Sequence, residues 1–181
     1  MNRLVSDSTI RYQSFPRTRP PPEFVRELVN VFRAHEDEIA TEELDDGLKS
    51  DNVLAELRDD LTDIGFDVEE GKKREEKIFR PVLFGENGEP QLRYEVDAYH
   101  EEHRCGLEVE AGRAWKGNAI YRDLIQAMMM VQVDTLALAV PNAYKHANGV
   151  NPAYERTRDV VATLYDVDRA ELPFDTVVIG Y

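Results

Sequence analysis

The spacing of hydrophobic residues changes along this chain, and these changes predict the order of its helices and strands. In the first third, apolar side chains recur every three or four residues, a period typical of amphipathic helices. They predict one helix over about residues 23–40 and a second helix that begins near Ser50 and ends at Gly65. After residue 76 the period shortens to two, which predicts half-buried strands over residues 77–84, 92–99 and 104–111.

The last third of the chain returns to helices and adds two strands that are apolar at nearly every position. A helical pattern follows Gly112, and another covers about residues 152–165. The runs 135–140 and 175–180 are typical of strands that are covered on both faces. The chain is therefore predicted to be an α/β protein with a mixed central sheet flanked by helices.

Residues 1–22 differ in composition from the rest of the chain. Arginines alternate there with Ser, Thr and Pro, and the segment ends in three prolines, which favours an extended chain without a packed face. The sequence predicts a flexible N-terminal arm over residues 1–22 and a single domain over residues 23–181. No stretch approaches the roughly 18 apolar residues that a membrane span needs, so we expect a cytoplasmic protein without membrane contact.

The net charge argues against a protein that coats nucleic acid nonspecifically. Such a protein gains its affinity from many contacts with phosphates, whereas this chain has a formal net charge of -14 at pH 7. Residues 1–70 carry 8 basic and 18 acidic residues, and residues 71–181 carry 14 and 18, so the excess of acid lies mainly in the first part. Adaptation to high salt is another explanation for this excess of acidic residues.

Three acidic residues of the predicted hairpin can form a metal site. The alternation places Glu108 and Glu110 on one face of their strand, and Asp97 lies on the polar face of the preceding strand. A twisted hairpin can bring these carboxylates together, and Mg²⁺ prefers oxygen ligands from one or two carboxylates, water and phosphate. A metal so held polarises a phosphoryl oxygen and lowers the pKa of bound water. The simpler interpretation, a solvated acidic face, stays open.

The residues around these acids resemble a known signature. Tyr94-Glu95-Val96-Asp97 is followed, after ten intervening residues, by Glu108-Val109-Glu110. This pattern resembles the PD-(D/E)XK nuclease superfamily, in which an Asp on one strand precedes Glu-x-Lys on the next. Glu110 stands where Lys is usual, as in a minority of type II restriction endonucleases. The resemblance covers about residues 50–141 and implies a restriction-endonuclease-like fold.

The resemblance also implies a role for each acidic residue. Asp97, Glu108 and the Val109 carbonyl would hold Mg²⁺, or Mn²⁺ as its substitute, and Glu110 would bind the metal or orient the attacking water. The family often contributes one more Glu from the helix before the hairpin. Glu56 matches that position, although a solvated helix residue would look the same in the sequence.

The basic group that the motif lacks has to come from elsewhere in the chain. The Glu-Val-Glu strand runs directly into residues 112–117, which contain two basic residues and precede a predicted helix. A helix N-terminus beside basic side chains suits a phosphate group. Lys116 is therefore the predicted replacement and Arg113 the second choice, and both are expected to contact the nucleic acid.

Two functions from different classes follow from these observations. The first is a Mg²⁺-dependent endonuclease that hydrolyses phosphodiester bonds, of DNA above all, in restriction, defence or repair. Such enzymes often pair so that two sites cut two strands, which makes a homodimer an expected partner, although the sequence shows no interface. The alternative is a non-catalytic binding or assembly module whose metal site has decayed, which Glu110 and the acidic surface favour. An unrelated α/β protein with an acidic hairpin is a third interpretation.

Overall fold

A six-stranded mixed sheet forms the centre of the protein. The computed structural model describes residues 8–41, 49–111, 118–146, 149–167 and 171–181. The strand order is β1-β10-β7-β6-β5-β2, in which β6, β7 and β10 run parallel and the remaining neighbours antiparallel. The strands are β1 (Arg11–Phe15), β2 (Phe66–Val68), β5 (Ala98–His100), β6 (Cys105–Val109), β7 (Thr135–Val140) and β10 (Asp175–Gly180).

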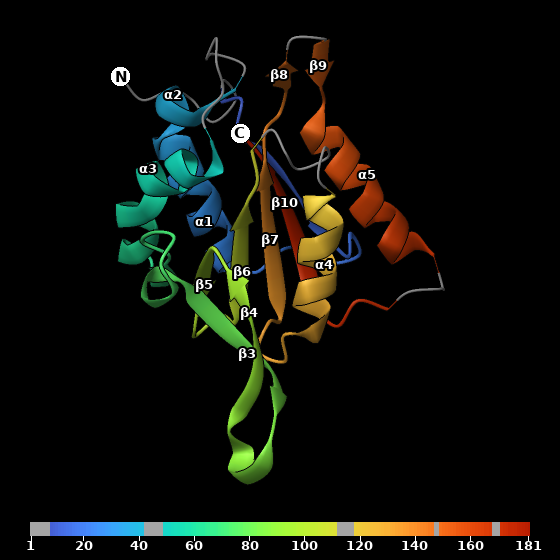
Figure 1. The fold of residues 1–181 in the computed structure, drawn as a ribbon. Coiled ribbons are helices and arrows are strands. Elements are labelled where there is room, and N and C mark those ends of the chain that lie inside the picture. The colour runs from blue at the N-terminus through green and yellow to red at the C-terminus, as the bar shows by residue number, and fades with distance from the viewer. Residues whose placement is uncertain (1–7, 42–48, 112–117, 147–148, 168–170) are drawn as a thin grey trace.

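Helices cover both faces of this sheet, as Figure 1 shows. Their apolar stripes form two separate cores, one on each face, which confirms the predicted α/β class with a mixed sheet flanked by helices. None of the helices in the described segments is long and apolar enough to cross a membrane. The helices are α1 (Glu23–Ala34), α2 (Glu36–Ile39) and α3 (Ser50–Asp63) on one face, and α4 (Ala119–Met129) and α5 (Ala153–Asp166) on the other.

The N-terminal segment departs from the prediction of a flexible arm. Residues 11–15 form β1, which pairs antiparallel with β10 at the edge of the sheet. Asn142 fixes this strand, since its Oδ1 accepts a 2.8 Å hydrogen bond from Arg11 Nε and its Nδ2 donates a 2.9 Å bond to the Thr9 carbonyl. An edge strand needs few apolar side chains, so its composition resembles that of a loop. Residues 1–7 lie outside the described part.

The strand predicted over residues 92–99 is divided in two. Its first part is β4 (Pro90–Val96), which pairs with β3 (Ile78–Phe84) in a two-stranded ribbon that projects from the body of the molecule (Figure 1). Its second part is β5, which returns to the central sheet beside β6. Asp97 occupies the break between the two parts. A second small ribbon, β8 (Tyr144–His146) with β9 (Gly149–Asn151), was not predicted.

Candidate metal and phosphate site

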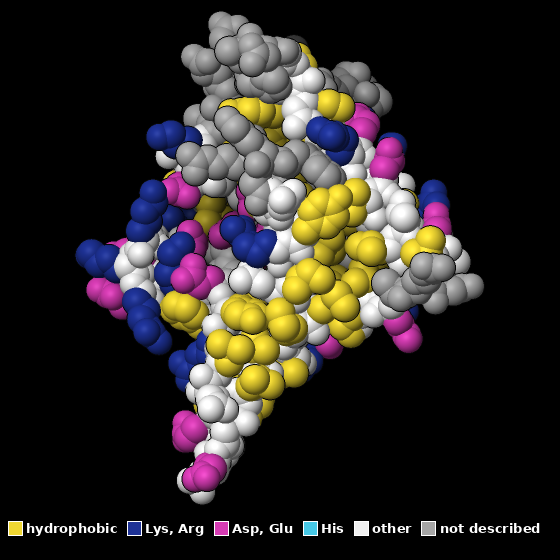
Figure 2. Space-filling model, turned by 45° about the vertical axis from the view of Figure 1, so that its right-hand side comes forward, with side chains coloured by type: hydrophobic (Ala, Val, Ile, Leu, Met, Phe, Trp, Pro, Cys, Tyr) yellow, Lys and Arg dark blue, Asp and Glu magenta, His cyan; other side chains and the backbone are white. Residues whose placement is uncertain are grey.

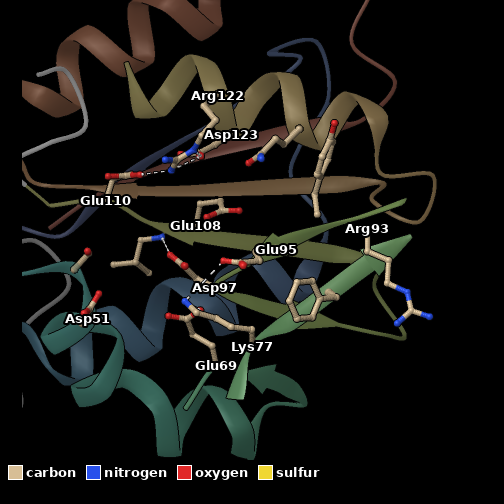
Figure 3. Close-up of a pocket in the computed structure, with 15 residues that line it drawn as sticks. Asp51, Glu69, Lys77, Arg93, Glu95, Asp97, Glu108, Glu110, Arg122 and Asp123 are labelled. Atoms are coloured by element: carbon tan, nitrogen blue, oxygen red, sulfur yellow. Dashed lines mark hydrogen bonds and ion pairs between the residues drawn. The ribbon is translucent and has the colours of Figure 1, made fainter. Parts of the chain in front are cut away.

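A cavity of about 440 Å³ opens where the projecting ribbon leaves the sheet (Figure 3). Seven acidic and three basic side chains line it, so its lining suits a cation and, once a cation is bound, a phosphate. The lining residues come from the start of α3, the end of β2, the ribbon, β6 and α4: Ser50, Asp51, Glu69, Lys77, Phe79, Arg93, Tyr94, Glu95, Asp97, Glu108, Val109, Glu110, Arg122, Asp123 and Gln126.

Asp97 connects the break in its strand to the strand that carries the other two acids. Its Oδ2 accepts a 2.8 Å hydrogen bond from the backbone N–H of Val109. Burial raises the pKa of Asp97 to about 7, with further rises from the negative charges of Glu69 and Asp123, even though the Val109 N–H acts in the opposite direction. The carboxylate of Asp97 is therefore held in place, but its charge is poorly compensated.

Glu108 in β6 and Glu110 just after it reach the same cavity, as their alternation predicts. Burial raises the pKa of Glu108 well above its usual range, and repulsion from Asp97 and other acids raises it further. Burial also raises the pKa of Glu110 to about 7, although Arg122 Nη2 lies 3.2 Å from its Oε1. The prediction that Asp97, Glu108 and Glu110 share one side of the hairpin agrees with this geometry, whereas their role as ligands stays a prediction.

Asp123 is another acid of the cavity, and it was not among the residues predicted from the sequence. It projects from α4, is 2% exposed, and accepts a 3.0 Å hydrogen bond from Arg122 Nε through its Oδ1. Its Oδ2 is buried, and no nitrogen or hydroxyl group of the described residues donates to it. The signal was present, because Asp123 interrupts the apolar stripe formed by Ile120, Leu124 and Ala127.

Lys77 and Glu69 form the other group that the sequence did not reveal. Lys77 Nζ lies 2.6 Å from Glu69 Oε2, and both side chains are largely enclosed. Figure 3 shows this pair beside Asp97, while Glu110 and Arg122 lie at the opposite end of the cavity. Glu69 follows β2 and Lys77 precedes β3, so only the tertiary structure places them here.

Among the predicted site residues in the described segments, Glu56 is the one that the cavity does not include. Glu56 is exposed on α3 and does not line the cavity; Asp51, five positions earlier in the same helix, lines it instead. Five residues correspond to about 140° around an α-helix, so the two side chains face different directions. The prediction for Glu56 is therefore corrected. Lys116 and Arg113 lie outside the described residues.

The side-chain oxygens that line the cavity are the kind of ligand that a hard divalent cation prefers. Carboxylate oxygens dominate the lining, Asp123 presents an oxygen without a donor, and the mutual repulsion of the acids would be relieved by a positive charge. In the described part of the chain, however, no group of three or more His, Cys, Asp or Glu side chains is gathered closely enough to hold a metal ion. Rotation of the carboxylate side chains is therefore needed for a cation to bind.

The fold that this chain adopts is that of the restriction endonucleases. No family model and no curated protein matches its sequence. Among solved structures, it is similar to restriction endonuclease BglII in complex with a DNA 16-mer, with a TM-score of 0.50. The match covers 94% of this chain and 75% of that chain at 9% sequence identity. At this identity the likeness establishes the shared fold alone.

Proposed function

We propose that this chain is a Mg²⁺-dependent endonuclease that hydrolyses phosphodiester bonds of DNA. The observation that carries the proposal is that Asp97, Glu108 and Glu110 line one cavity of a restriction-endonuclease fold. Charged groups with raised pKa values in a cavity are typical of functional sites, because a purely structural surface avoids crowding like charges. The structural neighbour was solved with DNA, which supports DNA as the substrate class.

Each residue of the cavity has a distinct part in this proposal. Asp97, Glu108 and the Val109 carbonyl would hold Mg²⁺ or Mn²⁺, which supplies Lewis acidity at a phosphoryl oxygen and an acidified water. The Val109 N–H keeps Asp97 oriented. Glu110 would accept a hydrogen bond from the attacking water, and Arg122 holds Glu110 at the edge of the cavity. Asp123 would contribute a further oxygen to the cation or to its waters.

A non-catalytic module with the same fold is the second candidate. Two observations favour it: Glu110 replaces the usual Lys of the motif, and the carboxylates of the described residues are not gathered around one point. A decayed site of this kind would still bury its acids but would gain no stability from a divalent cation. Cation binding therefore separates the two candidates before any cleavage assay.

We also propose that the protein forms a homodimer. Figure 2 shows hydrophobic side chains gathered on the face that holds α4 and the base of the ribbon. Such a patch is typical of an interaction surface. The large apolar residues exposed on α4 and just after it are Tyr121, Ile125, Met128, Met129 and Val131.

Cleavage of supercoiled plasmid by the purified protein tests the enzymatic proposal. We expect nicked and linear products with Mg²⁺ or Mn²⁺ and none with EDTA, and we expect Asp97→Asn and Glu108→Gln to reduce cleavage to background. Glu56→Gln is the matched control, since this exposed acid lies outside the cavity and should retain full activity. An RNA of the same sequence, assayed in parallel, tests the substrate class. Cleavage that persists in both cavity variants would contradict the proposal.

The homodimer is tested separately by sedimentation. Ile125→Glu should shift a dimer to monomer, because a charge then replaces an exposed apolar side chain of α4. A monomeric wild type would remove the dimer from the proposal and leave the cavity untouched.

A further inference from the structure

The cavity contains a lysine although the sequence motif lacks one. The side chain of Lys77 is 18% exposed, whereas that of Arg122 is 59% exposed. Arg122 is also engaged with both Glu110 and Asp123, and Arg93 is exposed. Of the basic groups that the structure describes in the cavity, Lys77 is therefore the most enclosed.

The register of the ribbon brings Lys77 close to Asp97. Ile78 pairs with Val96, and Lys77 and Asp97 are the residues that adjoin this pair at the base of the ribbon, where Figure 3 shows them near one another. Two contacts of Glu69 reinforce this arrangement. Its carboxylate accepts the 2.6 Å bond from Lys77, and its backbone N–H donates a 2.9 Å bond to the Asp97 carbonyl. One residue thus fixes both the lysine and the strand break that carries the acid.

We infer that Lys77 is the catalytic cation of this site, replacing the lysine that the Glu-Val-Glu motif lacks, and that Glu69 is its positioning residue. The inference rests on the proposed function. It moves the role from Lys116, which follows the motif in sequence, to a residue that lies 31 positions before Glu108. The substrate group that Lys77 would contact is the scissile phosphate.

The chemistry assigns Lys77 the part of a charged donor. During hydrolysis the oxygen of water forms a bond to phosphorus, the bond from phosphorus to the leaving oxygen breaks, water releases one proton and the leaving oxygen takes one up. The ammonium would donate a hydrogen bond to a non-bridging oxygen as its negative charge grows. Burial acts to lower the pKa of Lys77, but the bond to Glu69 and the charges of Glu69, Glu95 and Asp97 outweigh it, so the pKa is raised and the group stays cationic.

The test measures both plasmid cleavage and Mn²⁺ affinity in the whole chain. We expect Lys77→Met to lower plasmid cleavage by about 100-fold or more, as the loss of a preorganised donor does. The same variant should bind Mn²⁺ several-fold more tightly in calorimetry, because a positive charge has left the acidic cavity. Lys77→Arg should recover part of the cleavage. Lys73→Met is the matched control, since the side chain of Lys73 is 72% exposed in the same segment and should change neither quantity.

A double-mutant comparison of cleavage tests whether Glu69 acts through Lys77. A merely structural role of Glu69 would not make its effect depend on the presence of Lys77. We expect Glu69→Gln to lower cleavage by about 10-fold alone and to have no further effect in the Lys77→Met background, because both substitutions remove one function. Equal effects in both backgrounds would overturn the positioning role. Wild-type cleavage in Lys77→Met, or an unchanged Mn²⁺ affinity, would overturn the role of Lys77 and leave the proposed function intact. A wild type that neither binds Mn²⁺ nor cuts would overturn both.

Discussion

The carboxylate of Asp97 accepts a 2.8 Å hydrogen bond from the backbone N–H of Val109, so the break between β4 and β5 is joined to the end of β6. The same carboxylate lines the acidic cavity and has a pKa raised to about 7. Asp97 therefore stabilises the chain through its oxygen and destabilises it through its charge. Substitutions can separate these two effects.

The first prediction compares Asp97→Asn with Asp97→Ala. The amide keeps an oxygen for the Val109 N–H but removes the charge, so the free energy of unfolding at pH 8 without divalent cations should rise by about 1–3 kcal/mol. The alanine leaves a backbone donor unpaired, and it should be less stable than the asparagine variant by about 1–3 kcal/mol. Urea denaturation measures both. An asparagine variant less stable than the wild type would show that the charge of Asp97 is well compensated.

The second prediction concerns the pH dependence of stability without divalent cations. The pKa values of Asp97 and Glu110 are raised to about 7 in the folded state and lie near 4 in the unfolded chain. Their contribution to stability is therefore fully present below pH 4 and is lost as pH rises through 7, because the folded state then has to ionise buried acids. The stability difference between Asp97→Asn and the wild type should be near zero at pH 4 and largest above pH 8. A difference that does not change with pH would contradict the raised pKa values.

The third prediction concerns divalent cations. A ligand that binds only the folded state raises its melting temperature, so Mg²⁺ or Mn²⁺ should stabilise the wild type at pH 8. Thermal melts should show this rise lost in Asp97→Asn and Glu108→Gln and reduced in Asp123→Asn, whose native carboxylate has an oxygen without a donor. Glu56→Gln should keep the full rise. A wild type without any shift would favour the non-catalytic module.

The fourth prediction tests the placement of the N-terminal strand. Asn142 is 2% exposed and binds both Arg11 and the Thr9 carbonyl, so Asn142→Ala removes two hydrogen bonds that fix β1. The free energy of unfolding should fall by about 1–3 kcal/mol. Amide hydrogen exchange should quicken in β1, which pairs with β10. Asn30→Ala, exposed on α1, is the control and should change stability by less than about 0.5 kcal/mol.

The sequence by itself determined the secondary structure wherever burial follows a regular period. β7 and β10 occupy the predicted ranges, and α3 and α5 lie within two residues of theirs, because a stripe or a run of apolar residues is a local property. The alternation in β6 likewise determined that Glu108 and Glu110 share a side with one another. The α/β class follows from these elements together.

Only the tertiary structure decided which charged side chains meet. Lys77 faces Asp97 because of the ribbon register, Glu69 joins them because β2 pairs with β5, and Asp123 joins them because α4 packs on the sheet. β1 was missed because its backbone pairing leaves little trace in composition. Backbone hydrogen bonds and charge pairs join residues that are distant in the chain. The spacing of hydrophobic residues is a local property, so it does not predict which distant residues meet.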